Sequence, residues 1–151
     1  MSTHPDEPTP ASGEPMRDRN DLIVLDPREC LSLLASVPIA RVALAINAVP
    51  VVLPVNFVLD GDEIIIRSAK GTKLDASLGC EVVAVEADEY DAVDHSGWSV
   101  VVKGRVRKLT DPAEIERAAG LPLRPWGSRN AHHYLAVSTE LVSGRRVASS
   151  P

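Results

Sequence analysis

The stretch that decides the fold is residues 39–68, which read IARVALAINAVPVVLPVNFVLDGDEIIIRS. Within residues 41–46, large apolar side chains occupy the even positions, and arginine or alanine occupies the odd ones. A period of two residues is typical of a β-strand with one buried face, and it predicts a strand over residues 39–46. The period returns up to residue 59, and Asp60-Gly61-Asp62 then forms a turn before residues 63–68. We therefore predict an antiparallel meander of three strands.

Two residues interrupt the second of these strands, Pro54 and Asn56. Proline lacks the backbone N–H group that pairs with a neighbouring strand, so its strand should lie at a sheet edge or border a cavity. An asparagine amide in an otherwise apolar strand needs hydrogen-bond partners, so Asn56 either bonds a neighbouring loop or faces a ligand. The residues themselves leave both interpretations open.

Prolines also mark the starts of two helices. Asp26-Pro27 predicts a helix over residues 27–36, and Asp111-Pro112 predicts another that ends at residue 119, because each pair offers a capping side chain before a proline. Thr72 and Asp75 fit a capping box and predict a short helix that ends by Gly79. Further strands are predicted over residues 80–87, 98–109, 132–139 and 141–147, with an acidic loop over residues 88–96. Together these elements predict a mainly β fold, an antiparallel barrel with short peripheral helices.

Composition narrows the class of protein. The chain has 151 residues, of which 44% are hydrophobic, and its formal net charge is −5. Nucleic-acid-binding domains are usually basic, so no nucleic-acid partner is expected. No apolar run approaches the roughly 18 residues that span a bilayer, and the N-terminus lacks the pattern of a signal peptide. We therefore expect no membrane partner and a cytoplasmic location.

The first 20 residues differ from the rest of the chain. They hold four prolines and four acidic residues with few apolar side chains. Such a composition buries too little surface to offset the entropy of ordering, so we predict a disordered tail over residues 1–20. The folded domain is predicted over residues 21–148.

The clearest chemical signal is the sequence RSAKGTK at residues 67–73. It places Arg67 at a strand end, Ser68 beside it, and Thr72 and Lys73 at the start of a helix. Two cations, two hydroxyl groups and the N–H groups of a helix start would suit a phosphate group. The alternative is an ordinary connection between a strand and a helix, with solvated basic side chains.

The other motifs do not indicate a metal site or a catalytic site. His132 and His133 are adjacent on a predicted strand, so their side chains face opposite sides and cannot easily share one metal ion. Cys30 and Cys80 are too few for a zinc site or a disulfide framework. No nucleophile motif and no dinucleotide-binding fingerprint occurs. We therefore expect no metal site and assign no catalytic residue.

In their order and spacing, these motifs resemble those of the pyridoxamine 5′-phosphate oxidase-like proteins, and among them the small actinobacterial-type members. The resemblance spans roughly residues 22–147. It rests on residues 38–43, 50–56, 66–68, 71–73, 97–104 and 143–146. It implies a split antiparallel β-barrel that binds FMN, and a homodimer whose two cofactor sites lie at the subunit interface.

The resemblance also implies roles for individual residues. Arg67 and Lys73 would hold the FMN phosphate, and Ser68 and Thr72 would add hydroxyl or backbone donors. The ring edge would be lined by Pro54, Val55, Asn56 and Ile66, with Trp98 and Ser99 approaching from the other subunit and Arg124 and Trp126 covering the face of the ring.

The implied activity is a flavin-dependent oxidation or reduction of a small-molecule substrate. Enzymes that oxidise pyridoxamine phosphate carry a C-terminal Arg and His motif, which has no counterpart after Arg146, so we do not expect that substrate. One alternative is an F420-dependent reductase on the same fold. Another is a flavin-binding or sensing dimer without turnover. The sequence names neither the substrate nor the electron donor, and it leaves the roles of His132 and His133 open.

Overall fold

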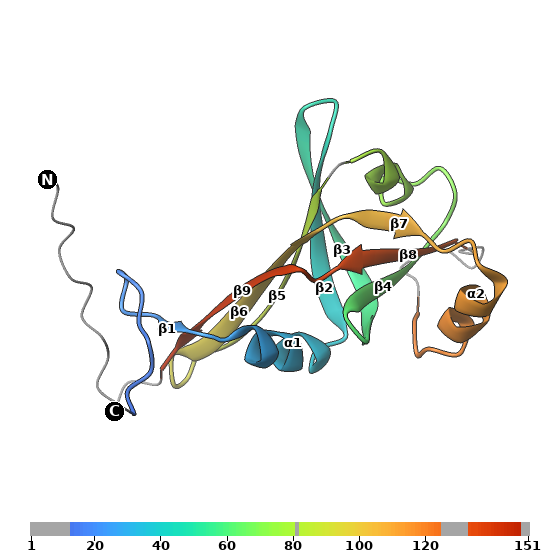
Figure 1. Ribbon diagram of the computed structural model, residues 1–151. Coiled ribbons are helices and arrows are strands. Elements are labelled where there is room, and N and C mark those ends of the chain that lie inside the picture. The colour runs from blue at the N-terminus through green and yellow to red at the C-terminus, as the bar shows by residue number, and fades with distance from the viewer. Residues whose placement is uncertain (1–12, 81, 125–132, 149–151) are drawn as a thin grey trace, which may run out of the picture.

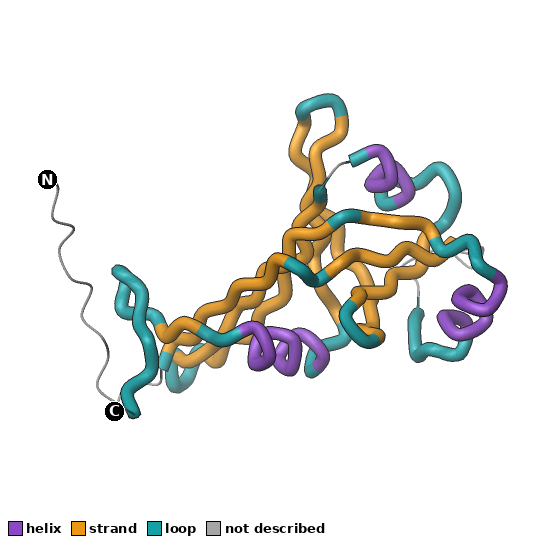
Figure 2. The backbone as a smooth tube through the Cα atoms, in the orientation of Figure 1, coloured by secondary structure: helices purple, strands orange, loops and turns teal. Residues whose placement is uncertain are grey.

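The described residues form a single nine-stranded antiparallel sheet that curls on itself (Figure 1; Figure 2). The computed structural model describes residues 13–80, 82–124 and 133–148. The strand order in the sheet is β1-β9-β6-β5-β2-β3-β4-β8-β7. In chain order the elements are β1 (Ile23–Val24), α1 (Pro27–Ala35), β2 (Ile39–Ile46), β3 (Val49–Asp60), β4 (Glu63–Ser68), the 3-10 helix η1 (Asp75–Gly79), β5 (Val83–Asp91), β6 (Ser96–Gly104), β7 (Val106–Lys108), α2 (Pro112–Ala119), β8 (His133–Ser138) and β9 (Leu141–Val147).

The predicted meander forms the middle of this sheet. β2 pairs with the first part of β3, and the end of β3 pairs with β4. Val42, Leu44, Val55 and Phe57 are buried in the main core, as the two-residue period predicts. The mainly β split barrel with short helices is therefore confirmed.

Pro54 occupies the kind of position that its chemistry requires. Among the described residues, β3 pairs over residues 49–56 with β2 alone, and β4 joins β3 from Phe57 onward. This part of β3 is thus an edge, where a missing N–H group costs no pairing.

The predicted strand over residues 98–109 is wrong in one respect, because the structure divides it. β6 pairs with β5 and β9, whereas β7 pairs with β8 in the other half of the barrel. The chain changes partners at Gly104, whose missing side chain lets it approach Ser138 so closely that a Cβ atom would overlap the Ser138 carbonyl oxygen. A hydrophobic pattern does not report such a change of partner.

The acidic loop predicted over residues 88–96 is also mostly wrong. β5 continues to Asp91, and Glu89 and Tyr90 pair with Trp98 and Gly97. Residues 88–91 are exposed. They carry polar side chains at both parities, so no alternation marks them as strand.

Both predicted α-helices are confirmed, and each begins at a capping aspartate. The Asp26 carboxylate accepts a hydrogen bond from the Glu29 N–H group (2.8 Å), and the Asp111 carboxylate accepts one from the Ala113 N–H group (3.0 Å). α1 packs against β9 and buries Leu34 completely. No helix among the described residues is long and apolar enough to cross a membrane.

The contacts of the domain begin before the predicted boundary at residue 21. The Val24 N–H group donates to the Met16 carbonyl (2.8 Å), and the Arg145 guanidinium donates to the Asp18 carboxylate (2.9 Å). The later part of the predicted tail therefore contacts β1 and β9, whereas residues 1–12 lie outside the described residues.

Candidate functional site

The RSAKGTK segment forms a loop that leaves β4 and enters η1. The Thr72 hydroxyl accepts a hydrogen bond from the Asp75 N–H group (3.1 Å), and the Asp75 carboxylate accepts one from the Gly71 N–H group (3.0 Å). Gly71 has a φ of 78°, a left-handed conformation that glycine adopts at little cost. The predicted capping box is only half formed, because the Asp75 carboxylate bonds the N–H group of Gly71 and not that of Thr72. The short 3-10 helix η1 begins only at Asp75, and its cap, Leu74, makes no side-chain hydrogen bond.

Three of the predicted phosphate-site residues, Ser68, Thr72 and Lys73, lie along this loop. The hydroxyl oxygens of Ser68 and Thr72 are 3.1 Å apart, and Ser68 is buried. Lys73 and its neighbour Lys70 are exposed on the loop. Both hydroxyl groups also donate to the Ala69 carbonyl (3.2 and 2.9 Å), so the loop after β4 carries two clustered hydroxyl groups and two exposed lysines.

Arg67 reaches this end of the sheet from the opposite face. Adjacent residues of a strand face opposite ways, so Arg67 and Ser68 lie on different sides of β4. The Arg67 guanidinium carbon lies 5.8 Å from the centre of the Tyr134 ring, over the face of that ring. Arg67 therefore has a partner within the chain, and its side chain is held beside the loop instead of among the two hydroxyl groups.

His133 makes a contact at this loop that was not predicted from the sequence. The Nδ1 atom of His133 lies 3.3 Å from the Asp75 carboxylate, and its Nε2 atom lies 3.5 Å from the Lys108 ammonium group. The Gly71 hydrogen bond, and then the contact with His133, lowers the pKa of Asp75. The contact arises because β8 pairs with β4, which places His133 opposite Ser68. No local motif reports that pairing.

The residues present fit a phosphate group. Lys70 and Lys73 supply positive charge on the loop that carries the Ser68 and Thr72 hydroxyl groups, and Arg67 adds charge from the other face of β4. In addition, the buried hydroxyl of Ser77, in η1, has no hydrogen-bond partner among the described residues. Cationic and hydroxyl donors on a short loop are the groups that bind phosphate oxygens.

The predicted ring-edge residues are divided between two environments. Val55 and Ile66 are 5% and 1% exposed and belong to the core, so only their backbone atoms remain available to a ligand. Pro54 lies on the outer face of β3. The Asn56 amide is half-buried and donates to the Pro38 carbonyl (3.3 Å). This bond to a neighbouring loop is one of the two interpretations that the sequence left open.

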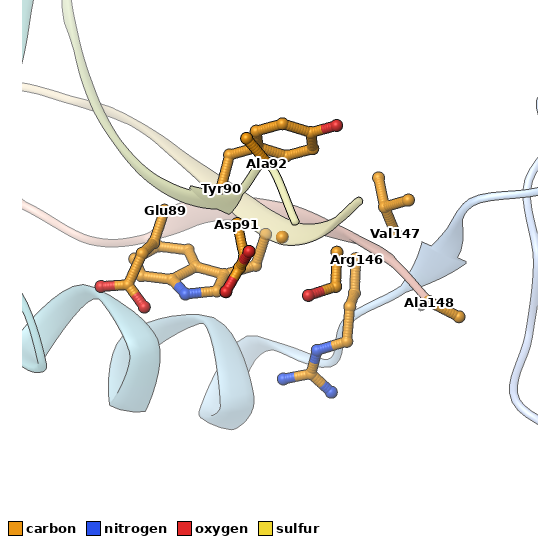
Figure 3. A pocket seen from close by; sticks show the side chains of 10 residues that line it. Glu89, Tyr90, Asp91, Ala92, Arg146, Val147 and Ala148 are labelled. Carbon is orange, nitrogen blue, oxygen red and sulfur yellow. The ribbon is translucent and has the colours of Figure 1, made fainter. Parts of the chain in front are cut away.

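Trp98 and Ser99 lie far from the loop within the chain. They belong to β6, and β5, β2 and β3 stand between β6 and β4 in the sheet (Figure 1). Trp98 helps to line a cavity of about 750 Å³. In Figure 3, Glu89 and Arg146 lie on the helix side of the sheet at this cavity, and Tyr90 and Val147 lie on the other side. Arg146 is paired there with Glu29 of α1 (2.7 Å).

The remaining predicted residues contribute less. Arg124 is exposed at the end of a described segment, after the buried Leu123. Trp126 and His132 lie outside the described residues. Within the part of the chain that the structure describes, no group of three acidic, histidine or cysteine side chains is arranged to hold a metal ion.

Comparison with known proteins places this fold and loop in a family. The family model for pyridoxamine 5′-phosphate oxidase matches residues 26–146. The chain belongs to the pyridoxamine 5′-phosphate oxidase family. The match covers the domain from the cap of α1 to β9, and it includes the loop that follows β4.

Solved structures agree with this assignment. A candidate pyridoxamine 5′-phosphate oxidase of Corynebacterium glutamicum is 29% identical, has a TM-score of 0.75, and aligns over 93% of this chain and 99% of its own. An FAD-binding protein of Mycobacterium smegmatis is 32% identical, has a TM-score of 0.67, and aligns over 82% of this chain and 95% of its own. An uncharacterized protein of Mycobacterium tuberculosis is 33% identical over 134 residues, which are 85% of this chain and 88% of the relative.

Proposed function

We propose that this protein binds a flavin nucleotide, FMN in the first instance, and uses it to oxidise or reduce a small molecule. The observation that carries the proposal is the cationic, hydroxyl-bearing loop after β4. It occurs in a chain that is 32% identical to an FAD-binding protein of the same fold. FAD contains the phosphate of FMN, so one loop suits either nucleotide.

The loop would hold the phosphate. Lys73 would pair with its oxygens. The hydroxyl groups of Ser68 and Thr72, which donate to the Ala69 carbonyl in this structure (3.2 and 2.9 Å), would turn to donate to the phosphate instead. Arg67 would add its charge from the Tyr134 side of β4, where its planar guanidinium is already oriented by the ring.

The ring would lie along β3. Its edge would meet the outer side of Pro54 and Asn56 and the backbone of Val55, while Ile66 supports β4 from the core. A bound flavin supplies the electron chemistry, and the protein fixes its position and surroundings.

We further propose a homodimer in which Trp98 and Ser99 of one protomer complete the site of the other. The separation of Trp98 from the loop in the sheet supports this arrangement. So does the outer face of β2 and β3, where apolar Ile39 and Val52 are 40% and 62% exposed. Arg41, paired with Glu86, stands between them on this face. Large exposed apolar side chains are typical of interaction surfaces.

The phosphate assignment is tested by Lys73→Ala and Arg67→Ala, made singly and together. Each change removes a charge-assisted contact of roughly 1.5–3 kcal/mol, so each should weaken FMN binding by about tenfold or more. The measurement is the dissociation constant from flavin fluorescence quenching. Lys103→Ala, which removes an exposed lysine from β6, is the matched control. Unchanged affinity in the double variant would reject the phosphate site.

Turnover is tested separately from binding. The flavin-loaded protein is mixed with NADH or NADPH without oxygen, and bleaching of the flavin absorbance is followed. Bleaching that an added electron acceptor reverses supports an oxidoreductase. Bound flavin that neither nucleotide reduces supports the alternative, a flavin-binding protein without turnover.

A further inference from the structure

His133 connects the loop after β4 to β7. Its ring lies between the Asp75 carboxylate, 3.3 Å from Nδ1, and the Lys108 ammonium group, 3.5 Å from Nε2. The side chains of His133 and Asp75 are each about one-fifth exposed. Three elements therefore meet at one imidazole: η1 through Asp75, β7 through Lys108 and β8 through His133 itself.

The two partners determine which ring nitrogen carries the proton. A carboxylate only accepts hydrogen bonds, so Nδ1 must carry the hydrogen that points to Asp75. An ammonium group only donates, so Nε2 must be the bare nitrogen that accepts from Lys108. A neutral imidazole with its hydrogen on Nδ1 satisfies both contacts.

Asp75 links His133 to Gly71, at the tip of the loop. One of its carboxylate oxygens faces His133, and the other accepts the Gly71 N–H group at 3.0 Å. Gly71 is the left-handed residue between the two exposed lysines of the loop. The conformation that presents Lys70 and Lys73 thus depends on the orientation of the Asp75 carboxylate.

We propose that His133 is a positioning residue for the phosphate-binding loop, acting through Asp75 on the Gly71 N–H group. The ligand class is a phosphate ester, and this role rests on the proposed flavin function. His133 itself does not contact the phosphate ester. It holds the loop in the conformation that receives one, and Lys108 holds His133.

The test uses the full chain with His133→Asn, His133→Gln and His133→Ala. Asparagine places an N–H donor where Nδ1 stands, so His133→Asn should bind FMN about as tightly as the unchanged protein. Glutamine and alanine place none there, so both should weaken FMN binding by about tenfold. His95→Ala is the control, because His95 is an exposed histidine whose Nδ1 contacts only the Tyr90 hydroxyl among the contacts described (3.1 Å).

A second measurement does not depend on flavin. Amide hydrogen exchange at Gly71 should be faster in His133→Gln and His133→Ala than in the unchanged protein, and His133→Asn should restore slow exchange. Equal exchange in all four proteins would overturn the positioning role even if FMN binds. If the unchanged protein binds no flavin but Gly71 follows this order, the proposed function fails and the positioning role stands.

Discussion

Gly104 is the residue at which the chain crosses from one half of the barrel to the other. A Cβ atom there would overlap the Ser138 carbonyl oxygen and press on the Ser138 and Val137 side chains. Gly104→Ala should therefore destabilise the fold by about 1–3 kcal/mol or more, because backbone on both sides must shift. Urea unfolding at neutral pH gives the free energy of unfolding for this variant.

Gly79→Ala is the matched control for Gly104→Ala. Gly79 is exposed, and nothing lies within 4 Å of the position that its Cβ atom would take. Its free energy of unfolding should stay within about 0.5 kcal/mol of the unchanged protein. Equal stability of the two variants would contradict the close approach at Gly104.

At the level of residues, the loop could be predicted because its members are contiguous in the chain. Arg67, Ser68 and Thr72 stand within one short motif, and Asp75 follows that motif by two residues. His133 lies 58 positions from Asp75, and only the pairing of β8 with β4 brings them together. The opposite facing of Arg67 and Ser68 follows from strand geometry, but it becomes visible only when the end of β4 is known.

At the level of elements, α2 is held to the sheet by ion pairs. The Arg107 guanidinium bonds both the Glu63 and Glu114 carboxylates, each with its closest contact at 2.8 Å, and Arg117 of α2 bonds Asp60. These arginines lower the pKa values of Glu114 and Asp60. A lowered pKa means that the ionised carboxylate is more stable in the folded state than in the unfolded state, so ionisation of these groups stabilises the fold.

These ion pairs predict a sensitivity to acid. Their contribution is present above the unfolded pKa values, near pH 4, and is lost as the pH falls through the lower folded values. Arg107→Met returns Glu114 toward its ordinary pKa, so the loss of stability between neutral pH and about pH 3 should be smaller in this variant. Urea unfolding across that range measures it.

Lys103→Met removes a cation from the same sheet without removing either ion pair. Its loss of stability on acidification should match that of the unchanged protein. If Arg107→Met lost stability as steeply as this control, the ion pairs of Arg107 would not be the source of the acid sensitivity.

Elements with a clear period or cap were predicted within one or two residues. β2, β9 and both α-helices are examples, since each shows alternation or an aspartate followed by proline. The division between β6 and β7 and the length of β5 were not predicted. Both depend on which strands pair across the barrel, and the local alternation of apolar and polar residues does not indicate the pairing partner.

At the scale of the whole molecule, the proposed dimer predicts the effect of a charge on the outer sheet face. Val52 lies on β3 opposite Ala43 of β2, and Ala43 lies opposite Ala84 of β5, so this part of the face is apolar. Val52→Glu would bury an unpaired carboxylate at the interface, which is costly. Sedimentation velocity should show a dimer for the unchanged protein and a monomer for this variant.

Val93→Glu is the control for that change. Val93 is 91% exposed in the turn between β5 and β6, away from the outer face of β2 and β3. It should sediment as the unchanged protein does. A Val52→Glu variant that stayed dimeric would place any interface elsewhere on the molecule.

The arrangement of the complete site could not be predicted from local sequence patterns. The loop after β4 and Trp98 are separated by three strands of the sheet, and in the proposed dimer the second protomer brings Trp98 to the ligand. The fold itself was predictable at this scale because its apolar alternation recurs in most of its strands.

Flavin binding by the loop after β4 is tested by titrating the purified, unchanged protein with FMN, FAD and F420 in parallel. Absorbance and the quenching of flavin fluorescence report binding. We expect saturable binding of FMN at one equivalent per chain, because each chain carries one such loop. If neither flavin binds, the proposed function is wrong, and tight binding of F420 with none of FMN would make F420 the cofactor.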